Sequence, residues 1–402
     1  MHRKDCRLKY KEEEGMRITL VQPYITSAVE RQFYNIQSFG LSKELVKYAS
    51  EVSILTSNLI WQNADRNFNP FKRYEEVIDG FKVAYLPTLG DCLSQPLMPT
   101  LIWELAKTRP DAVQVADDFQ LSTLATVIWS VFSTKPVFVY QGMYGYVSSL
   151  PWLHKLYLAL LGKIVYRFSK GFIAKTEAAK EFLVSQGVKS NKIKVVPVGF
   201  VREKYYEAKG DILKKLTNIN QGRILLNVGR LAPEKDQKTL ILAMEIIRRR
   251  HPDTYLVILG DGSQKNNLLG LIKEKGLQES VFIISQKIPN EKMNLIYSES
   301  FLCLIPATYE IFNMTMLECL ACGRPVIACN TGGMADVIKD RADGYLFDEH
   351  DYTAVAKYVC SLLEDQDKYR EFCRNAKRES EKFDWQVLAK EFIEFYERNW
   401  AR

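Results

Sequence analysis

The sequence predicts an α/β protein with two doubly wound parallel-sheet domains that face a central cleft. From Arg17 onward, short apolar runs of strand length alternate with amphipathic runs of helix length, which is typical of parallel sheets covered by helices. The alternation stops in a polar stretch at 200–221, which we interpret as an irregular linker, and then begins again. With 47% hydrophobic residues among 402, the chain has enough apolar residues for two cores.

The expected elements follow from these runs in chain order. In the first half we expect strands at 17–23, 51–57, 82–87, 111–117, 135–142, 171–176 and 192–199, and helices at 39–49, at 121–133 and from Glu177. In the second half we expect strands at 223–229, 254–260, 281–285, 301–307 and 324–330, and helices at 238–250, at 263–275, from Glu291, at 314–323 and after Phe383. The boundaries that follow are a charged, disordered tail at 1–15 and domains at 16–203 and 204–383.

Composition and cysteine content limit the class of protein. The net charge of +7 is compatible with phosphate ligands or an anionic membrane and requires neither, and we expect no nucleic-acid partner. Eight scattered cysteines indicate a reducing cytosol, and we interpret Cys319 and Cys322, a lone C-x-x-C in an apolar helix, as packed side chains. We find no apolar run long enough to span a bilayer and no secretory signal, so we expect a cytoplasmic protein.

Two glutamates stand in an otherwise apolar stretch, ATYEIFNMTMLECLACGRPVIACNTGG. Glu310 is expected at a helix entrance beside the carboxyl end of a strand, where open α/β sheets bind ligands, and Glu318 lies about two turns further along. Each carboxylate could accept hydrogen bonds from the vicinal hydroxyls of a sugar. Alternatively, Glu310 favours the helix N-terminus and Glu318 lies on a solvated face. The stretch alone does not decide between the two interpretations.

Two further strand–loop–helix turns line the same expected cleft. In NVGRLAPEKDQ, Gly229 allows a tight turn, and Arg230 and Lys235 flank a helix N-terminus, an arrangement suited to a diphosphate. The alternative is two surface cations on a loop. In LGDGSQ, Gly260 and Gly262 lack the G-x-G-x-x-G spacing of a dinucleotide site, so we interpret them as turn residues beside the cleft.

Together, GRLAPEK, the E-x7-E of Glu310 and Glu318, ACGRPVIA and NTGG resemble the retaining glycosyltransferases of family 4. The resemblance implies the GT-B arrangement of two Rossmann-like domains, with a last helix at 384–402 that crosses back to the first domain. It implies a nucleotide-diphosphate-sugar as co-substrate, no other cofactor and no bound metal. It assigns the diphosphate to Arg230 and Lys235, the donor sugar to Glu310, and the ribose to Glu318. The other implied donor-side residues are Gly229, Gly260, Gly262, Ile288, Ile311, Phe312, Asn313 and Leu317.

The chain departs from the family pattern at several positions. Ile311 and Asn313 replace glycines of the usual E-G-F-G, and Gln141 replaces the usual histidine of the first domain. The glycine-rich loop after the first strand is absent. Asp117 and Asp118 lack the D-x-D spacing of a metal site. Two interpretations stay open for them: a role on the acceptor side, or simple helix capping or loop polarity. The departures leave two alternatives to an active transferase: an inactive nucleotide-sugar-binding protein, and an epimerase or phosphorylase of the same fold.

One more stretch of the sequence bears on the acceptor and on contact with a membrane. A transferase of this family is expected to act on a saccharide or lipid-linked hydroxyl. No Asp or Glu occurs between Asp118 and Glu177, where the chain average of 48 in 402 would place about seven. Within this span, 151–172 has a helical wheel with Lys155, Lys163, Arg167 and Lys170 on one side and Leu153, Tyr157, Leu161, Ile164 and Phe168 on the other. This pattern predicts either a core-packed helix or peripheral contact with the inner face of the cell membrane.

Overall fold

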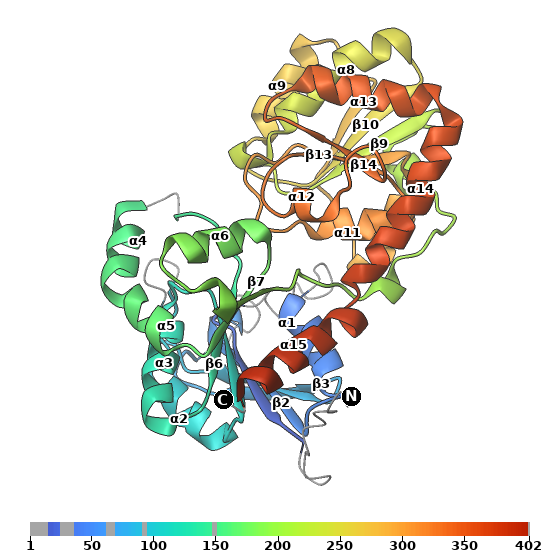
Figure 1. Cartoon of the computed structure of the whole chain (residues 1–402). Helices are drawn as coiled ribbons and strands as arrows, with labels where there is room; N and C mark the ends of the chain where they lie inside the picture. Colours follow the sequence, from blue (N-terminus) through green and yellow to red (C-terminus); the bar gives the residue numbers. More distant parts are fainter. Residues whose placement is uncertain (1–14, 25–35, 62–68, 91–94, 147–150, 401–402) are drawn as a thin grey trace, which may run out of the picture.

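The computed structural model describes residues 15–24, 36–61, 69–90, 95–146 and 151–400. They form two α/β domains, one above the other in Figure 1, which confirms the predicted class. The tail expected at 1–15 lies outside the described residues except for Gly15, as do Cys6, Cys92 and most of the loop after the first strand. Among the described helices, none combines the length and the apolar composition needed to cross a bilayer.

The N-terminal sheet has the strand order β3-β4-β2-β1-β5-β6-β7-β8, and only the β3–β4 pair is antiparallel. Its strands are β1 (Arg17–Val21), β2 (Glu51–Ser57), β3 (Tyr74–Ile78), β4 (Phe81–Leu86), β5 (Ala112–Ala116), β6 (Val137–Gln141), β7 (Gly171–Ala174) and β8 (Ile193–Val195). Strand β3 was not expected. Its signal was the pair Asp79–Gly80, because both residues adopt positive φ in the turn, which favours Asp-Gly in hairpins.

The helices of this domain cover the sheet between consecutive strands. They are α1 (Gln37–Leu45), α2 (Leu101–Thr108), α3 (Leu121–Ser133), α4 (Pro151–Tyr157), α5 (Lys163–Phe168) and α6 (Glu177–Ser185). A single π-helical turn, Leu158–Gly162, joins α4 to α5. The stretch expected as one regular helix at 151–172 is therefore helical, with a change of phase in its middle.

The C-terminal sheet is parallel throughout, with the order β11-β10-β9-β12-β13-β14. Its strands are β9 (Arg223–Val228), β10 (Thr254–Leu259), β11 (Val281–Ile284), β12 (Leu302–Ile305), β13 (Val326–Cys329) and β14 (Gly344–Phe347). Its helices are α8 (Gln237–Arg250), α9 (Lys265–Glu274), α10 (Met293–Glu299), α11 (Met314–Ala321), α12 (Met334–Val337), α13 (Tyr352–Glu364) and α14 (Gln366–Ser380). The stretch expected as an irregular linker contains a further helix, α7 (Ile212–Thr217), so that expectation was wrong in part.

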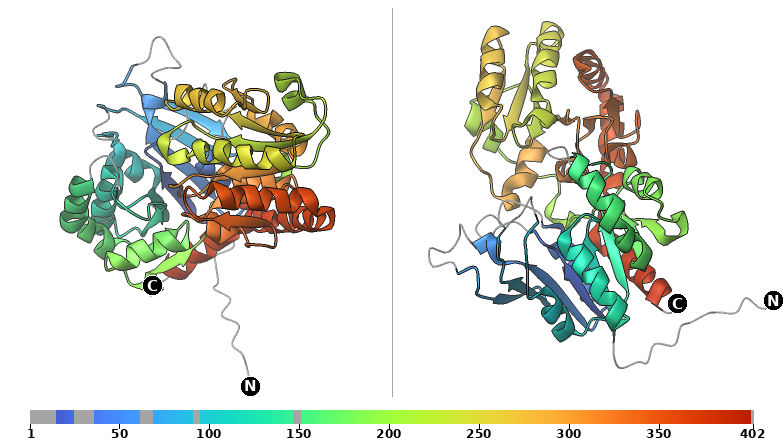
Figure 2. Two further views of the ribbon diagram at one scale, coloured as in Figure 1. Left: turned by 90° about the horizontal axis from the view of Figure 1, so that it is seen from above. Right: turned by 90° about the vertical axis from the view of Figure 1, so that its left-hand side faces the viewer.

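The last helix, α15 (Trp385–Trp400), packs against α1 of the N-terminal domain, beside which it is drawn in red in Figure 1. Figure 2 shows the end of the chain at the first domain from two further sides. Trp385 is buried between two glycines that have no room for a side chain. A Cβ on Gly40 or Gly199 would lie 2.3 or 2.6 Å from the indole. Further along, the Tyr396 hydroxyl bonds to Gln114 of β5. The segment after α14 thus ties the chain end to the first domain.

Cys319 is not a simple packed thiol. It forms a disulfide with Cys303, which joins α11 to the adjacent strand β12. Cys322 remains a buried free thiol, so the interpretation of both C-x-x-C cysteines as packed side chains holds only for Cys322. The error arose because Cys303 lies 16 residues away in sequence, and only the strand–helix packing brings the two sulfur atoms together.

Candidate active site

A cavity of about 170 Å³ opens at the carboxyl ends of β9 and β12 in the C-terminal domain. Parallel sheets place ligand sites at this edge, because the loops and helix N-termini converge there. Its lining comprises Asn227, Val228, Gly229, Arg230, Lys235, Gln237, Ile305, Pro306, Ala307, Glu310, Phe312, Asn313, Met314 and Thr315. Six residues expected at the donor site are therefore brought together: Gly229, Arg230, Lys235, Glu310, Phe312 and Asn313.

The centre of the cavity is an ion pair between Lys235 and Glu310. Asn313 donates a second hydrogen bond to the same carboxylate oxygen of Glu310, over 3.1 Å, while its own Oδ1 accepts the Met316 N–H and caps α11. Because this cap fixes the Asn313 side chain, it also fixes the position of Glu310. The residue that replaces a family glycine thus holds the carboxylate in place.

Arg230 lies at the mouth of the cavity, where its guanidinium pairs with Glu234 across 2.7 Å and remains largely exposed. Both cations expected to hold a diphosphate are therefore paired with carboxylates, Arg230 with Glu234 and Lys235 with Glu310. A diphosphate would have to replace Glu234 and Glu310 as their partner. The diphosphate of a nucleotide sugar carries one negative charge on each phosphate, so its oxygens could accept charge-assisted hydrogen bonds from both cations.

Gly260 and Gly262 pack closely against the loop that follows β9. A Cβ on Gly260 would lie 1.9 Å from the carbonyl oxygen of Gly229, and one on Gly262 would lie 2.3 Å from that of Leu231. Neither glycine lines the cavity. Both are needed because the loop after β9 packs against their backbone.

Glu318 occupies a place that the sequence did not predict. It is 5% exposed, lies outside the cavity lining, and accepts hydrogen bonds from Tyr205 (3.0 Å) and Tyr297 (2.5 Å). Burial and the neighbouring carboxylate raise the pKa of Tyr297, which keeps its phenol protonated as a donor. The interpretation of Glu318 on a solvated face is therefore wrong. Leu317 is fully buried, Ile288 packs against the core, and neither lines the cavity.

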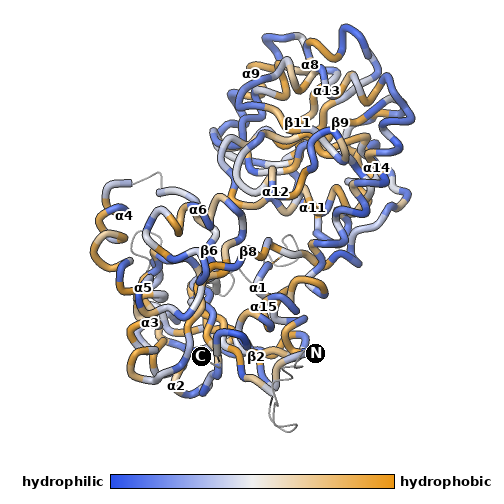
Figure 3. The backbone as a smooth tube through the Cα atoms, in the orientation of Figure 1, coloured by the Kyte–Doolittle hydropathy of each residue, from blue (hydrophilic) through white to orange (hydrophobic). Residues whose placement is uncertain are grey.

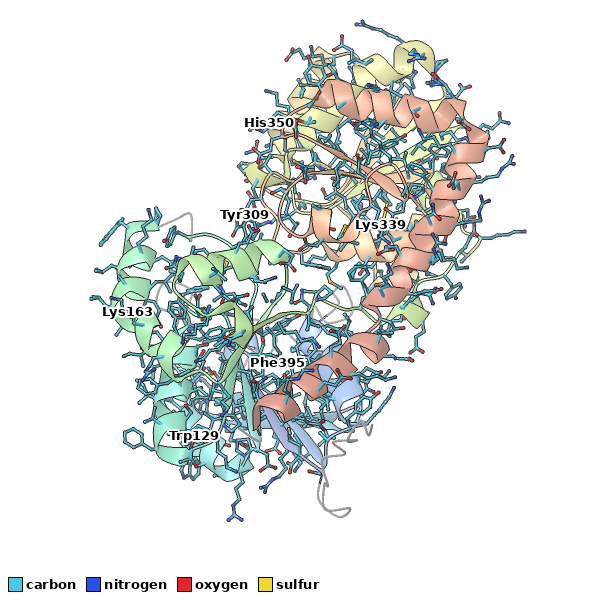
Figure 4. All side chains as sticks on the ribbon, viewed as in Figure 1. Trp129, Lys163, Tyr309, Lys339, His350 and Phe395 are labelled. Carbon is cyan, nitrogen blue, oxygen red and sulfur yellow. A yellow bond between two sulfur atoms is a disulfide. The ribbon has the colours of Figure 1, made fainter. Side chains whose placement is uncertain are left out.

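Ile311 points toward the N-terminal domain instead of the cavity. Its Cγ2 and the Lys175 ammonium each lie 3.2 Å from where a Cβ on Gly142 would stand. Close by, the rings of Tyr144 and Tyr309 stack across the two domains with centroids 5.2 Å apart, and Figure 4 shows Tyr309 at the side of its domain that faces the first. The two domains are thus in direct contact beside this cavity.

The three residues predicted for the acceptor side lie together at the ends of β5 and β6. Gln141 is fully buried, donates to Asp118 over 3.2 Å, and accepts from the Asp118 backbone N–H. Burial raises the pKa of Asp118 to about 6, and Tyr166 donates to its carboxylate. Asp117 has a positive φ and accepts the N–H groups of Gly142 and Met143, so it holds the loop that faces the cleft.

Sequence reasoning missed several residues that the tertiary structure places at the site. Lys175 follows β7, lies over the Tyr140 ring, and forms no ion pair among the described residues. Burial lowers the pKa of Lys175, and Asp117 opposes that change. Asn227 lines the cavity and is 4% exposed, and within the described part of the chain its Oδ1 has no partner. The sequence feature that could have indicated Asn227 is a single amide side chain within the apolar strand RILLNV.

Comparison with known proteins shows which family models the chain matches. Residues 39–204 match the model described as Glycosyltransferase Family 4, and residues 209–379 match that of Glycosyl transferases group 1. A D-inositol 3-phosphate glycosyltransferase of Salinispora tropica is 27% identical over 238 residues, covering 55% of this chain and 49% of its own. A glycogen synthase of Mycobacterium tuberculosis is 30% identical over 173 residues, covering 43% and 42%. The chain spans about half the length of the curated relatives it matches.

Solved structures with low sequence identity share the fold. Anabaena HepE in complex with UDP superimposes with a TM-score of 0.75 at 18% identity, covering 95% of this chain and all of its own. The sucrose-phosphate synthase of Thermosynechococcus elongatus gives 0.74 at 19% identity, covering 96% and 99%. At this level of identity the likeness concerns the two-domain architecture alone.

Proposed function

The chain belongs to glycosyltransferase family 4, with the GT-B fold, and we propose that it transfers a sugar from a nucleotide-diphosphate-sugar to an acceptor hydroxyl with retained configuration. The observation that carries this proposal is the group formed by Lys235, Glu310 and Asn313, with Arg230 at the mouth of one cavity. It offers two cations to a diphosphate and a positioned carboxylate to sugar hydroxyls.

In the proposed reaction, the donor first exchanges partners within this group. The diphosphate replaces Glu310 as the partner of Lys235, and the freed carboxylate accepts hydrogen bonds from the donor sugar. Arg230, Lys235 and the N-terminus of α8 then stabilise the charge that develops on the leaving diphosphate. The acceptor oxygen forms the new glycosidic bond, the bond from sugar to phosphate breaks, and the leaving phosphate takes the acceptor proton.

This reaction needs no histidine at the position of Gln141. An amide cannot act as a base near neutral pH, and Gln141 already uses both ends of its side chain in buried hydrogen bonds. We assign Gln141, Asp117 and Asp118 to the shape of the acceptor side. The acceptor is proposed to be a saccharide or a lipid-linked hydroxyl, in polysaccharide or glycolipid assembly, at the cytoplasmic face of the cell membrane.

The donor is to be found by thermal shift against a panel of nucleotide sugars, beginning with UDP-glucose, which Anabaena HepE binds in one of its structures. Product analysis with a radiolabelled donor then tests the reaction. We expect the label to appear on an acceptor with the anomeric configuration of the donor. Binding without turnover over a broad acceptor panel would favour the inactive sugar-nucleotide-binding alternative. A changed sugar without transfer would favour an epimerase, and release of a sugar phosphate a phosphorylase.

A further inference from the structure

The outer face of the N-terminal domain exposes large apolar side chains on two packed helical segments. Phe132 of α3 is 84% exposed, and Trp152 of α4 and Leu160 of the π turn are 64% and 63% exposed. Ile128, Val131, Leu156, Leu161 and Phe168 are also exposed. Because α3 packs against α5, these residues lie on one surface, which we call the outer helix face. Figure 3 shows hydrophobic stretches along α3, α4 and α5 at this outer edge.

The helical stretch at 151–168 buries a different side from the one that the helical wheel predicted. The side of the helical stretch that packs on the domain carries His154, Leu158, Gly162 and Val165, all of them buried. Leu153, Tyr157 and Ile164, which the helical wheel placed on one apolar side, are only half-buried. The separation into an apolar side that packs and a basic side that is exposed was therefore wrong, because the neighbouring side of the helix packs on the domain. The exposed side mixes aromatic, aliphatic and basic residues.

The same face is positively charged. Lys155, Lys163 and Arg167 are exposed, and in the described part of the chain none of them forms an ion pair. Figure 4 shows Lys163 at the outer edge of the domain. Burial and the repulsion of Arg167, Lys189 and Lys170 lower the pKa of Lys192, which indicates a local excess of positive charge. No acidic residue occurs at 119–176 to compensate for it.

We infer that the outer helix face docks the protein peripherally on an anionic bilayer. Exposed apolar patches of this kind mark interaction surfaces. A bilayer fits better than an acidic protein or a polyanion, because Trp152, Phe132 and Leu160 protrude among the cations. Amphipathic aromatic and basic side chains together suit the boundary between headgroups and acyl chains.

The position of this face relates docking to the proposed reaction. In the chain, β6, whose end carries Gln141, is followed by the loop at Tyr144 and then by α4. His154 of α4 packs against Phe119, which follows the acceptor-side pair Asp117 and Asp118. An acceptor held in the bilayer would therefore approach the acceptor side. This last step rests on the proposed function, whereas membrane docking itself does not.

Vesicle sedimentation tests the inference without any reaction. The full chain is mixed at low salt with vesicles of phosphatidylcholine alone or of an equimolar mixture with phosphatidylglycerol. We expect the wild type to bind the anionic vesicles, more weakly at high salt. The triple variant Lys155→Glu, Lys163→Glu and Arg167→Glu should lose roughly a hundredfold in partitioning, since each basic residue contributes to attraction by an anionic surface. Phe132→Ala, Trp152→Ala and Leu160→Ala together should lose about tenfold.

Two matched variants control for general effects of charge and hydrophobicity. Lys273, Lys357 and Lys377 changed to Glu reverse three exposed cations of the C-terminal domain. Leu269, Tyr352 and Val387 changed to Ala remove exposed apolar side chains elsewhere. Both should bind like the wild type, and circular dichroism checks folding. Absence of wild-type binding, equal binding to neutral vesicles, or equal losses in test and control variants would overturn the inference. A loss from the charge variant alone would identify a polyanion site instead of a bilayer site.

Discussion

The hydroxyl of Tyr205 lies 3.0 Å from Oε1 of Glu318 and donates a hydrogen bond to it. Tyr205 comes from the segment that joins the two domains, whereas Glu318 lies in α11 at the core of the second. The family resemblance assigns this carboxylate to the ribose of the donor. A ribose that bonded to Glu318 would share its carboxylate with the hydroxyls of Tyr205 and Tyr297, and would thereby couple nucleotide binding to the interdomain segment.

The first prediction concerns the tyrosines around Glu318. Tyr297→Phe should lower the free energy of unfolding by about 1.5–3 kcal/mol, because it removes a hydrogen bond to a buried carboxylate. Urea denaturation measures the loss. Tyr206→Phe, a change at an exposed neighbour of Tyr205, is the control and should be neutral. Equal stability of Tyr297→Phe and the wild type would show that Glu318 does not depend on this bond.

Glu318→Gln should mainly weaken nucleotide binding. The amide is a weaker acceptor for ribose hydroxyls than the carboxylate, and calorimetry with UDP and with the diphosphate-sugar measures both affinities. If the affinity for both ligands stays at the wild-type value, the ribose does not contact Glu318. The carboxylate is then a structural partner of Tyr205 and Tyr297 only.

Glu310 and Asn313 should affect turnover more than binding. Glu310→Gln is expected to lower kcat, because the sugar must be held in the reacting position. Asn313→Asp keeps an N-cap for α11 but places a negative charge beside Glu310, so it should lower turnover while leaving stability nearly unchanged. Asn313→Ala removes the cap as well and should cost about 1 kcal/mol of stability. Full activity in Glu310→Gln would refute the assignment.

Donor binding should depend on the two cations of the loop after β9. Arg230→Ala or Lys235→Ala is expected to weaken binding of a nucleotide-diphosphate-sugar by roughly 1.5–3 kcal/mol, the scale of a charged hydrogen bond. Binding of the bare nucleoside should change little, since it carries no phosphate. Lys238→Ala on α8 serves as a control, and calorimetry measures all four proteins. Unchanged diphosphate-sugar affinity in both test variants would contradict the phosphate role.

The buried carboxyl of Asp118 predicts a pH dependence of stability. The pKa of Asp118 is about 6 in the folded protein, above its ordinary value of 3.8, so the folded state binds the proton more tightly. The protonated Asp118 therefore contributes on the order of 2–3 kcal/mol to the free energy of unfolding below about pH 4. This contribution is lost as the pH rises through 6. Asp118→Asn should therefore show less loss of unfolding free energy between pH 4 and 7 than the wild type. Exposed Asp367→Asn is the control, and parallel curves for all three would contradict the prediction.

Local patterns in the sequence determined the fold class and the core of the candidate site. Alternating apolar and amphipathic runs predicted the parallel strands, because burial of strand faces and helix stripes imposes these periods on nearby residues. The short motifs GRLAPEK and EIFN predicted Arg230, Lys235 and Glu310, which lie on loops that follow adjacent strands of the sheet. Such loops meet at the edge of a parallel sheet wherever the strands pair side by side.

Contacts between distant segments were decided only by the tertiary structure. The partners of Glu318 come from the interdomain segment and from α10, and the partner of Cys319 comes from β12, so no local spacing could reveal them. The exposed side of the stretch 151–172 depended on which side packs on the domain, because His154, Leu158 and Val165 are buried whereas Leu161 and Phe168 of the predicted apolar side are exposed. Periodicity determines which residues share a face, but burial of that face depends on what packs against it.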